Sequence, residues 1–165
     1  MLRAHAVNLL VDVRKIPKSR FNPQFNIENL PAALQNAGIE YRHLPELGGL
    51  RHPRPDSANT GWRNSSFRGY ADYMQTPAFA AALAELMRIA KGRRAVVMCA
   101  EAVPWRCHRS MIADALTARG ETVEHILSET KLSTHQLTKF AVVEGTLVKY
   151  PGENLGLFEE QPSLH

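Results

Sequence analysis

The densest group of chemically capable side chains lies in residues 98–109. This stretch contains Cys99 and Glu101 and ends in the run Cys107-His108-Arg109. A thiol at the start of a helix, beside a histidine and an arginine, is more acidic than a free thiol. Cys107 is therefore a candidate nucleophile assisted by His108, with Glu101 as a candidate acid or base and Arg109 as an anion contact. The alternative is that both cysteines are small buried core residues.

A second group combines a carboxylate with several cations. Asp12 and Arg14 are two residues apart, so on a strand they share a face. They form either a structural ion pair or a catalytic acid next to a guanidinium that holds phosphate. The cations of this stretch, with no acid among them, are Arg14, Lys15, Lys18 and Arg20. We predict that it contacts an anionic ligand, with His43 nearby at the end of the next strand.

Aromatic side chains follow a long segment, residues 45–69, that is rich in glycine, proline and arginine. Tyr70 and Tyr73 come directly after it, and Trp105 lies in the cysteine-rich stretch. Aromatic rings next to cations suit a stacked base or sugar. We predict that these three rings stack a ligand, with the alternative that the tyrosines pack in the core.

Other kinds of site receive little support from the sequence. Phosphatase and rhodanese loops place a strand-end cysteine closer to an arginine than Cys99 lies to Arg106. Cys99, Cys107 and His108 with a distant histidine have the chemistry to bind zinc, but the usual metal-binding spacings are absent. Glycine-rich nucleotide loops are absent as well. We therefore predict neither a metal nor a cofactor.

Composition restricts the class of protein and its partners. With 44% hydrophobic and 22% charged residues, the chain is typical of globular proteins. The sequence has no apolar run of membrane-spanning length and no signal-peptide pattern. Its two cysteines are too few for a disulfide framework. Together these observations predict a cytoplasmic protein without a membrane partner. The net charge of +4 is uneven, because residues 1–109 contain 16 basic and 8 acidic side chains, against 4 and 8 in residues 110–165. The basic part favours nucleic acid or a phosphate-bearing ligand, unless it is only a solvated surface.

Apolar patterning predicts the elements that position these residues. Strands are expected over residues 9–13, 39–44, 95–99 and 122–127, helices over 29–37, 70–74, 76–91 and 104–119, and a hairpin over 140–150. This order predicts an α/β fold: a single domain at residues 1–151 with three α/β/α layers, a mostly parallel sheet and a C-terminal hairpin. Residues 152–165 are expected to form a disordered tail.

The carboxyl ends of parallel strands are where such folds bind ligands. The first predicted strand ends with Asp12 and Arg14, and the second ends with His43. The third ends with Cys99 and Glu101, and His125 lies within the fourth. We therefore expect the carboxylates, guanidiniums and thiols to share one site at this edge.

Four segments, taken in order, resemble one family. They are Leu-Val-Asp-Val-Arg at 10–14, Pro-Lys-Ser-Arg-Phe-Asn-Pro-Gln-Phe at 17–25, His-Leu-Pro-Glu-Leu-Gly-Gly at 43–49, and Cys-Ala-Glu with Cys-His-Arg within 99–109. They are similar to the family catalogued as domain of unknown function 488, over about residues 2–151. The resemblance implies an α/β/α fold, a site built from these motifs, and a DNA glycosylase-like activity on modified pyrimidines. It also implies that the family's first strand is missing here, which would leave an open sheet edge and invite a homodimer.

Three functions follow as hypotheses. The first is hydrolysis at a nucleic-acid base, in which Arg14, Lys18, Arg20 and Arg109 hold phosphate, the aromatic rings stack the base, and Asp12 or Glu101 acts in catalysis. The second is a thiol-dependent sulfur or phosphoryl transferase that uses Cys99 or Cys107. The third is a non-enzymatic module that binds nucleic acid or an anion.

Overall fold

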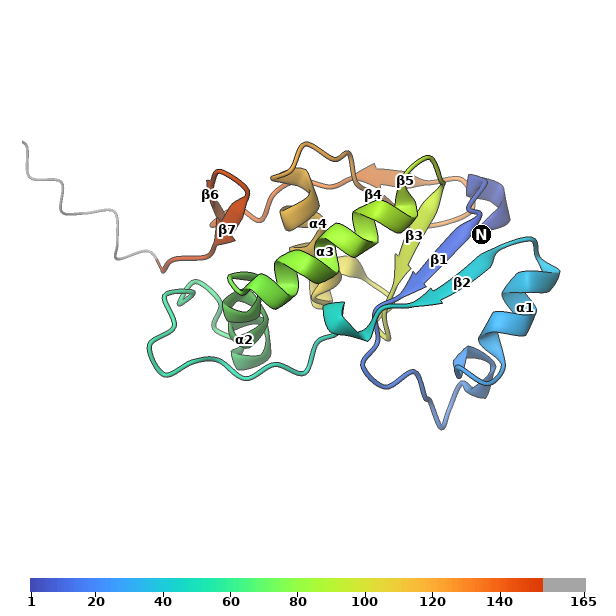
Figure 1. Ribbon diagram of the computed structural model, residues 1–165, viewed down its shortest axis with the longest axis horizontal. Helices are drawn as coiled ribbons and strands as arrows, with labels where there is room; N and C mark the ends of the chain where they lie inside the picture. Colours follow the sequence, from blue (N-terminus) through green and yellow to red (C-terminus); the bar gives the residue numbers. More distant parts are fainter. Residues whose placement is uncertain (153–165) are drawn as a thin grey trace, which may run out of the picture.

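Figure 1 shows the computed structural model, which describes residues 1–152. The helices are α1 (Leu30–Asn36), α2 (Ser65–Met74), α3 (Pro77–Ala90) and α4 (Arg109–Thr117). The strands are β1 (Leu9–Asp12), β2 (Glu40–His43), β3 (Ala95–Met98), β4 (Glu124–Ile126), β5 (Leu132–Thr134), β6 (Val142–Glu144) and β7 (Leu147–Lys149). Short 3-10 turns cover Arg3–His5, Pro23–Phe25, Pro45–Leu47 and Pro104–Arg106. The predicted tail falls almost entirely outside the described residues.

A parallel sheet with the order β2-β1-β3 forms the middle of the fold. On one face, Leu10 packs with Leu30 and Leu34 of α1. On the other face, Leu9 and Val11 pack with residues of α2, α3 and α4. The prediction of an α/β fold is thereby confirmed, with helices on both faces of the sheet. Strands β2 and β3 are its edges, and the predicted homodimer stays a prediction.

Local sequence signals explain where the helices begin. At α3, the Thr76 hydroxyl accepts a hydrogen bond from the Phe79 N–H at 3.2 Å, and Pro77 occupies the first turn, as predicted. Helix α2 is longer than expected, because the Asn64 side chain accepts hydrogen bonds from the N–H groups of Ser66 and Phe67. This cap starts the helix within the segment predicted to be irregular.

The predicted helix from residue 104 is wrong at its start. Pro104 opens a 3-10 turn, and Cys107 then adopts an extended backbone with φ −141° and ψ 150°. Helix α4 therefore begins only at Arg109. The break has a consequence for the site, since it places the Cys107 side chain immediately before the first turn of α4.

The fourth predicted strand exists but does not join the parallel sheet. Strand β4 pairs antiparallel with β5, with His125 opposite Ser133. A short turn joins the two strands, and a hydrogen bond from the Leu127 N–H to the Lys131 carbonyl oxygen closes it. Apolar periodicity shows that a strand exists, but it does not select the partner. His125 therefore does not belong to a strand of the parallel sheet.

The C-terminal hairpin is confirmed as β6 and β7, with Gly145 at φ +64° in its turn. Val148 and the following Tyr150 are at most 2% exposed and belong to the same core as α2 and α4. The Tyr150 N–H donates to Asn59 Oδ1 at 3.0 Å, and its hydroxyl donates to Asp114 Oδ2 at 2.8 Å. The hairpin thus closes the core.

None of the helices described between residues 1 and 152 has the length and apolar content that a membrane span requires.

Candidate functional site

The alternation of side chains along the strands divides the predicted site into two groups. Asp12 shares its strand face with Leu10, which packs toward α1, whereas Cys99 packs with the core on the α3 and α4 side. The parallel register pairs Asp12 with Met98, whose side chain packs with the α1 face. The structure therefore does not bring Asp12 together with the thiols, and each group is described separately.

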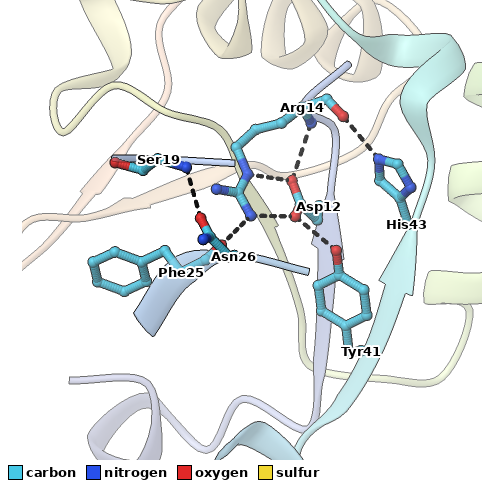
Figure 2. Close-up of polar contacts among 7 residues, drawn as sticks. All are labelled: Asp12, Arg14, Ser19, Phe25, Asn26, Tyr41 and His43. Atoms are coloured by element: carbon cyan, nitrogen blue, oxygen red, sulfur yellow. Dashed lines mark hydrogen bonds and ion pairs between the residues drawn. The ribbon is translucent and has the colours of Figure 1, made fainter. Parts of the chain in front are cut away.

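Asp12 lies in a closed ion pair, shown in Figure 2. Its Oδ1 accepts from the Arg14 N–H at 3.0 Å and from Arg14 Nε at 2.9 Å. Its Oδ2 accepts from Arg14 Nη2 at 2.6 Å and from the Tyr41 hydroxyl at 2.7 Å. Asp12 is 0% exposed. Both oxygens are thus occupied, which is the arrangement of a structural ion pair.

The electrostatics of this pair keep Asp12 ionised. Burial raises the pKa of Asp12, but hydrogen bonds from Arg14 and Tyr41 and the charge of Arg14 outweigh burial and lower it. Arg14 Nη2 also donates to the Phe25 carbonyl oxygen at 2.7 Å, so this guanidinium is not free to hold phosphate. His43 Nε2 lies 2.8 Å from the Arg14 carbonyl oxygen and holds the strand end (Figure 2).

The loop that follows Arg14 keeps its other cations at the surface. Lys15 and Arg20 are exposed, and Lys18 Nζ lies 3.5 Å from Glu28 Oε1. Inside the loop, the Ser19 N–H donates to Asn26 Oδ1 at 2.6 Å (Figure 2). Of the predicted anion contacts in this segment, Lys18 and Arg20 are thus displayed, whereas Arg14 is enclosed.

The second group brings the two thiols together. Cys99 Sγ and Cys107 Sγ lie 2.6 Å apart, and both cysteines are free. This separation exceeds the roughly 2.05 Å of a disulfide bond but is closer than non-bonded sulfurs normally pack. The Glu101 N–H donates to Cys99 Sγ at 3.2 Å, and the Arg109 N–H donates to Cys107 Sγ at 3.4 Å. The second of these contacts comes from the first turn of α4.

These contacts lower the pKa of Cys107 and raise the pKa of Cys99. The hydrogen bond from Cys99 is the largest influence that lowers the pKa of Cys107, and His108 and the Arg109 N–H lower it further against the effect of burial. The same bond, together with burial, raises the pKa of Cys99. Cys107 is thus the more acidic thiol of the pair, and Cys99 is the less acidic one.

Residues of two other segments surround the thiolate. His108 Nδ1 lies 3.6 Å from Cys107 Sγ, and the His108 and Tyr70 ring centroids are 4.8 Å apart. A Cβ atom on Gly49 would lie 3.1 Å from His108 Nδ1, so glycine allows the loop to approach the imidazole. Gly49 belongs to the Gly-Gly pair of the motif at 43–49, and such a pair is a sequence signal for close approach of a backbone.

Two of the three predicted aromatic contacts, Tyr70 and Tyr73, are held by contacts within the fold. Tyr70 is 1% exposed and its hydroxyl donates to the Leu47 carbonyl oxygen at 2.8 Å, so its ring has no free face for a base. The Tyr73 hydroxyl donates to the Glu46 carbonyl oxygen at 2.8 Å, and the Arg51 guanidinium lies 3.6 Å from the Tyr73 ring centroid. The side chain of Trp105 lies outside what the structure describes.

The remaining predicted residues, Glu101 and Arg109, frame the loop before α4. The Glu101 side chain is exposed to solvent. The Arg109 guanidinium donates to the carbonyl oxygens of Glu101 and Ala102 and thereby holds this loop against the helix. Within residues 1–152, no three side chains of histidine, cysteine, aspartate or glutamate are grouped as metal ligands.

The difference in pKa between Cys107 and Cys99 predicts how the alkylation of each thiol depends on pH. A free thiol has a pKa of about 8.5 and loses reactivity as the pH falls below that value. Because the pKa of Cys107 is lowered, its thiolate persists at more acidic pH, and iodoacetamide should label Cys107 with a midpoint well below about 8.5. Cys99 should be labelled only at higher pH. Residue-resolved mass spectrometry across the pH range measures both midpoints, and two ordinary or inert thiols would contradict the assignment.

Comparison with protein-family models matches residues 1–116 to the family described as Domain of unknown function DUF488. The matched residues include the Asp12 ion pair and both cysteines. No curated protein and no solved structure matches the chain.

Proposed function

Since the chain belongs to the Domain of unknown function DUF488 family, whose description assigns no activity, we propose its function from the thiol pair. We propose a thiol–disulfide oxidoreductase in which Cys99 and Cys107 alternate between a dithiol and an internal disulfide. The supporting observation is the direct contact of the two sulfurs, and the lowered pKa of Cys107 beside the raised pKa of Cys99 agrees with it. This arrangement matches the division of labour in dithiol enzymes, which pair an attacking thiolate with a resolving thiol.

The proposed reaction has two exchanges. The Cys107 thiolate attacks one sulfur of a substrate disulfide, the S–S bond breaks, and the other substrate sulfur leaves as a thiolate. Cys99 gives its proton to that thiolate and attacks Cys107 Sγ, which releases the second substrate thiolate. The substrate gains two electrons, the protein loses two as its internal disulfide forms, and a reducing thiol restores the pair.

Exposure restricts the substrate. Cys107 is 3% exposed, and Cys99 is the more exposed of the two. A disulfide on an extended, slender segment fits this access better than one buried in a folded surface. A sulfur or phosphoryl transferase is a weaker candidate, because a group carried on Cys107 would lie next to the Cys99 thiol. Cys99 would then discharge the carried sulfur before transfer.

Incubation with an aryl disulfide tests the proposal. We expect release of both aryl thiolates per protein, and a product whose mass is lower than that of the reduced protein by two hydrogen atoms. Peptide mapping should place the new bond between Cys99 and Cys107. Release of only one thiolate, with a lasting mixed disulfide, would show that the two sulfurs do not exchange with each other.

A second candidate function, nucleic-acid binding, is favoured by the loop over residues 15–25. Phe21 is 92% exposed and Ile16 is 66% exposed, which is unusual for apolar side chains. Lys18 and Arg20 are exposed beside them. A displayed aromatic ring flanked by cations suits base stacking together with phosphate contacts. Hydrolysis at a base would rely on Glu101, because the Asp12 carboxylate is occupied by Arg14 and Tyr41.

Replacing Phe21 should weaken binding to single-stranded DNA. Loss of one stacked base costs about 1–3 kcal/mol, so Phe21→Ala should raise Kd by roughly 5- to 150-fold without changing the salt dependence. Arg20→Ala should instead flatten the salt dependence by about one phosphate contact. Fluorescence anisotropy at several salt concentrations measures both effects, with Val142→Ala on β6 as an exposed apolar control. Equal binding by Phe21→Ala and the unmodified chain would exclude this loop as a base contact.

A further inference from the structure

The parallel sheet has an open edge at β3, which pairs with β1 on one side and with no described strand on the other. The Val13 N–H donates to the Met98 carbonyl oxygen at 3.0 Å, so the backbone groups of Met98 point toward β1. Successive residues of a strand direct their backbone groups to opposite edges, so the N–H and C=O groups of Ala95 and Val97 point away from β1. Within residues 1–152 these groups form no hydrogen bond. The edge of β3 is therefore open to a further strand.

Strand β4 has an open edge of the same kind. The His135 N–H donates to the Val123 carbonyl oxygen at 2.8 Å, so the backbone groups of every second residue from Val123 point toward β5. The backbone groups of Glu124 and Ile126 consequently point away from β5, and no described residue forms a hydrogen bond with them. Strands β3 and β4 belong to separate sheets, although Arg94 beside β3 and Glu124 of β4 form an ion pair at 3.8 Å. In the described residues, an ion pair and no backbone hydrogen bond thus joins the two strand edges.

A groove of about 950 Å³ is lined by residues of both strands and of helices α3 and α4. This volume is near the upper limit of the roughly 300–1,000 Å³ that is typical of ligand sites. Apolar side chains that are only partly buried form part of its wall, namely Met87 of α3, Leu116 of α4 and Val123 before β4. The groove therefore offers backbone donors and acceptors beside an apolar wall. An extended polypeptide uses both, whereas a lipid chain leaves the backbone groups unpaired.

The charge of the groove favours one kind of polypeptide. Its lining contains five lysine or arginine side chains and two glutamates. Arg88 and Arg93 form ion pairs at 2.7 Å with glutamates that do not line the groove, which leaves three cations against two carboxylates. Lys91, shortly before the start of β3, is exposed and has no ion-pair partner among the described residues. An acidic side chain is therefore favoured beside Lys91.

We propose that this groove binds an extended segment of a partner polypeptide, which adds as a strand to the open edge of β3. The backbone of the segment pairs with Ala95 and Val97 on one side, and with Glu124 and Ile126 of β4 on the other. Every second side chain of the segment is apolar and packs on the apolar wall, and an acidic side chain lies beside Lys91. The added strand joins the two sheets into one, in the order β2-β1-β3-segment-β4-β5.

Binding is tested by fluorescence anisotropy with a short labelled peptide in which valine and threonine alternate and a glutamate stands at each end. We expect saturable binding. One matched peptide has N-methyl groups on the amides of one edge, and another has serine in place of valine. Each should bind at least about tenfold more weakly, because it loses backbone hydrogen bonds or apolar contact. Equal binding of the N-methylated peptide, or no binding of the first peptide, would overturn strand addition.

The place of binding is tested by hydrogen exchange of the backbone amides of the chain. At saturation, the peptide should slow exchange of the Ala95 and Val97 N–H groups at least about tenfold and leave the β6–β7 hairpin unchanged. Protection elsewhere without protection of β3 would overturn the proposed place. Protection of these amides without peptide, in a chain that light scattering shows to be a dimer, would mean that a second copy fills the groove, which also overturns the proposal.

Lys91→Glu tests the charge of the partner. It should weaken binding of the glutamate-ended peptide about two- to fivefold, and strengthen binding of a peptide with lysine in place of glutamate. Lys139→Glu, at an exposed position outside the groove, is the control and should change neither affinity. The same change in both variants, or no change in Lys91→Glu, would overturn the assignment of an acidic partner.

Discussion

Cys107→Ser should abolish formation of the internal disulfide and slow the reaction with an aryl disulfide about tenfold or more near pH 6. In this variant only Cys99 remains, and an ordinary thiol with a pKa of about 8.5 is less than roughly 1% ionised at that pH. The lowered pKa of Cys107 keeps most of the unmodified protein reactive there. The difference is smaller than the ionised fractions alone suggest, because a more acidic thiolate is also a weaker nucleophile.

Cys99→Ser is the matched variant, since it keeps the nucleophile and removes the resolving thiol. We expect it to release one aryl thiolate and to retain the other as a stable mixed disulfide on Cys107. Stopped-flow absorbance gives the rates, and intact mass gives the products. If Cys107→Ser reacts as fast as the unmodified protein while Cys99→Ser does not react, the roles of the two cysteines are reversed.

Asp12→Asn should destabilise the fold by about 3–5 kcal/mol, because it leaves the Arg14 guanidinium buried without a counter-charge. Arg14 is 8% exposed, and three of its N–H contacts end on Asp12. Tyr41→Phe is the control, since it removes a single hydrogen bond to Asp12 and should cost about 1 kcal/mol. Urea unfolding measures both free energies. A cost for Asp12→Asn no larger than that for Tyr41→Phe would show that the ion pair contributes little.

The same ion pair predicts how stability depends on pH. The pKa of Asp12 is lowered in the folded chain, so the folded state binds its proton less readily than the unfolded state, in which an aspartate has a pKa of about 3.9. The contribution is therefore fully present above that pH and is lost as the pH falls further. In Asp12→Asn the acid side of the stability curve should be flatter, which urea unfolding at several acidic pH values would reveal.

The sequence predicted what depends on local spacing. Asp12 ends β1 and Arg14 follows it at a separation of two residues, and their ion pair is the predicted structural alternative. The capped start of α3 follows from Thr76-Pro77. The acidity of Cys107 was expected from its place before a helix and beside His108 and Arg109.

What the sequence did not predict depends on register and long-range pairing. The separation of Asp12 from Cys99 follows from the pairing of β1 with β3, in which Asp12 lies opposite Met98. The sequence does not show this register. Direct contact of the two sulfurs, eight residues apart, depends on the extended backbone at Cys107. Hydrogen bonds from Asp114 to His135 and from His135 to His125 join α4 to β4, and no short motif connects these positions. Tyr70 was predicted to stack on a ligand, with packing in the core as the alternative, and the sequence does not show the contact with Leu47 that encloses its hydroxyl.

The closure of the core by Tyr150 has a consequence for the order in which the molecule matures during translation. A nascent chain that has reached residue 116 contains the parallel sheet and all four described helices except the last residue of α4, but it lacks Val148 and Tyr150. Until those residues emerge from the ribosome, the Asn59 amide and the Asp114 carboxylate have no Tyr150 partner, and apolar surface on α2 and α4 stays open to water. An amino-terminal part that folds before residues 148–150 are synthesised therefore exposes the apolar surface that these residues later cover.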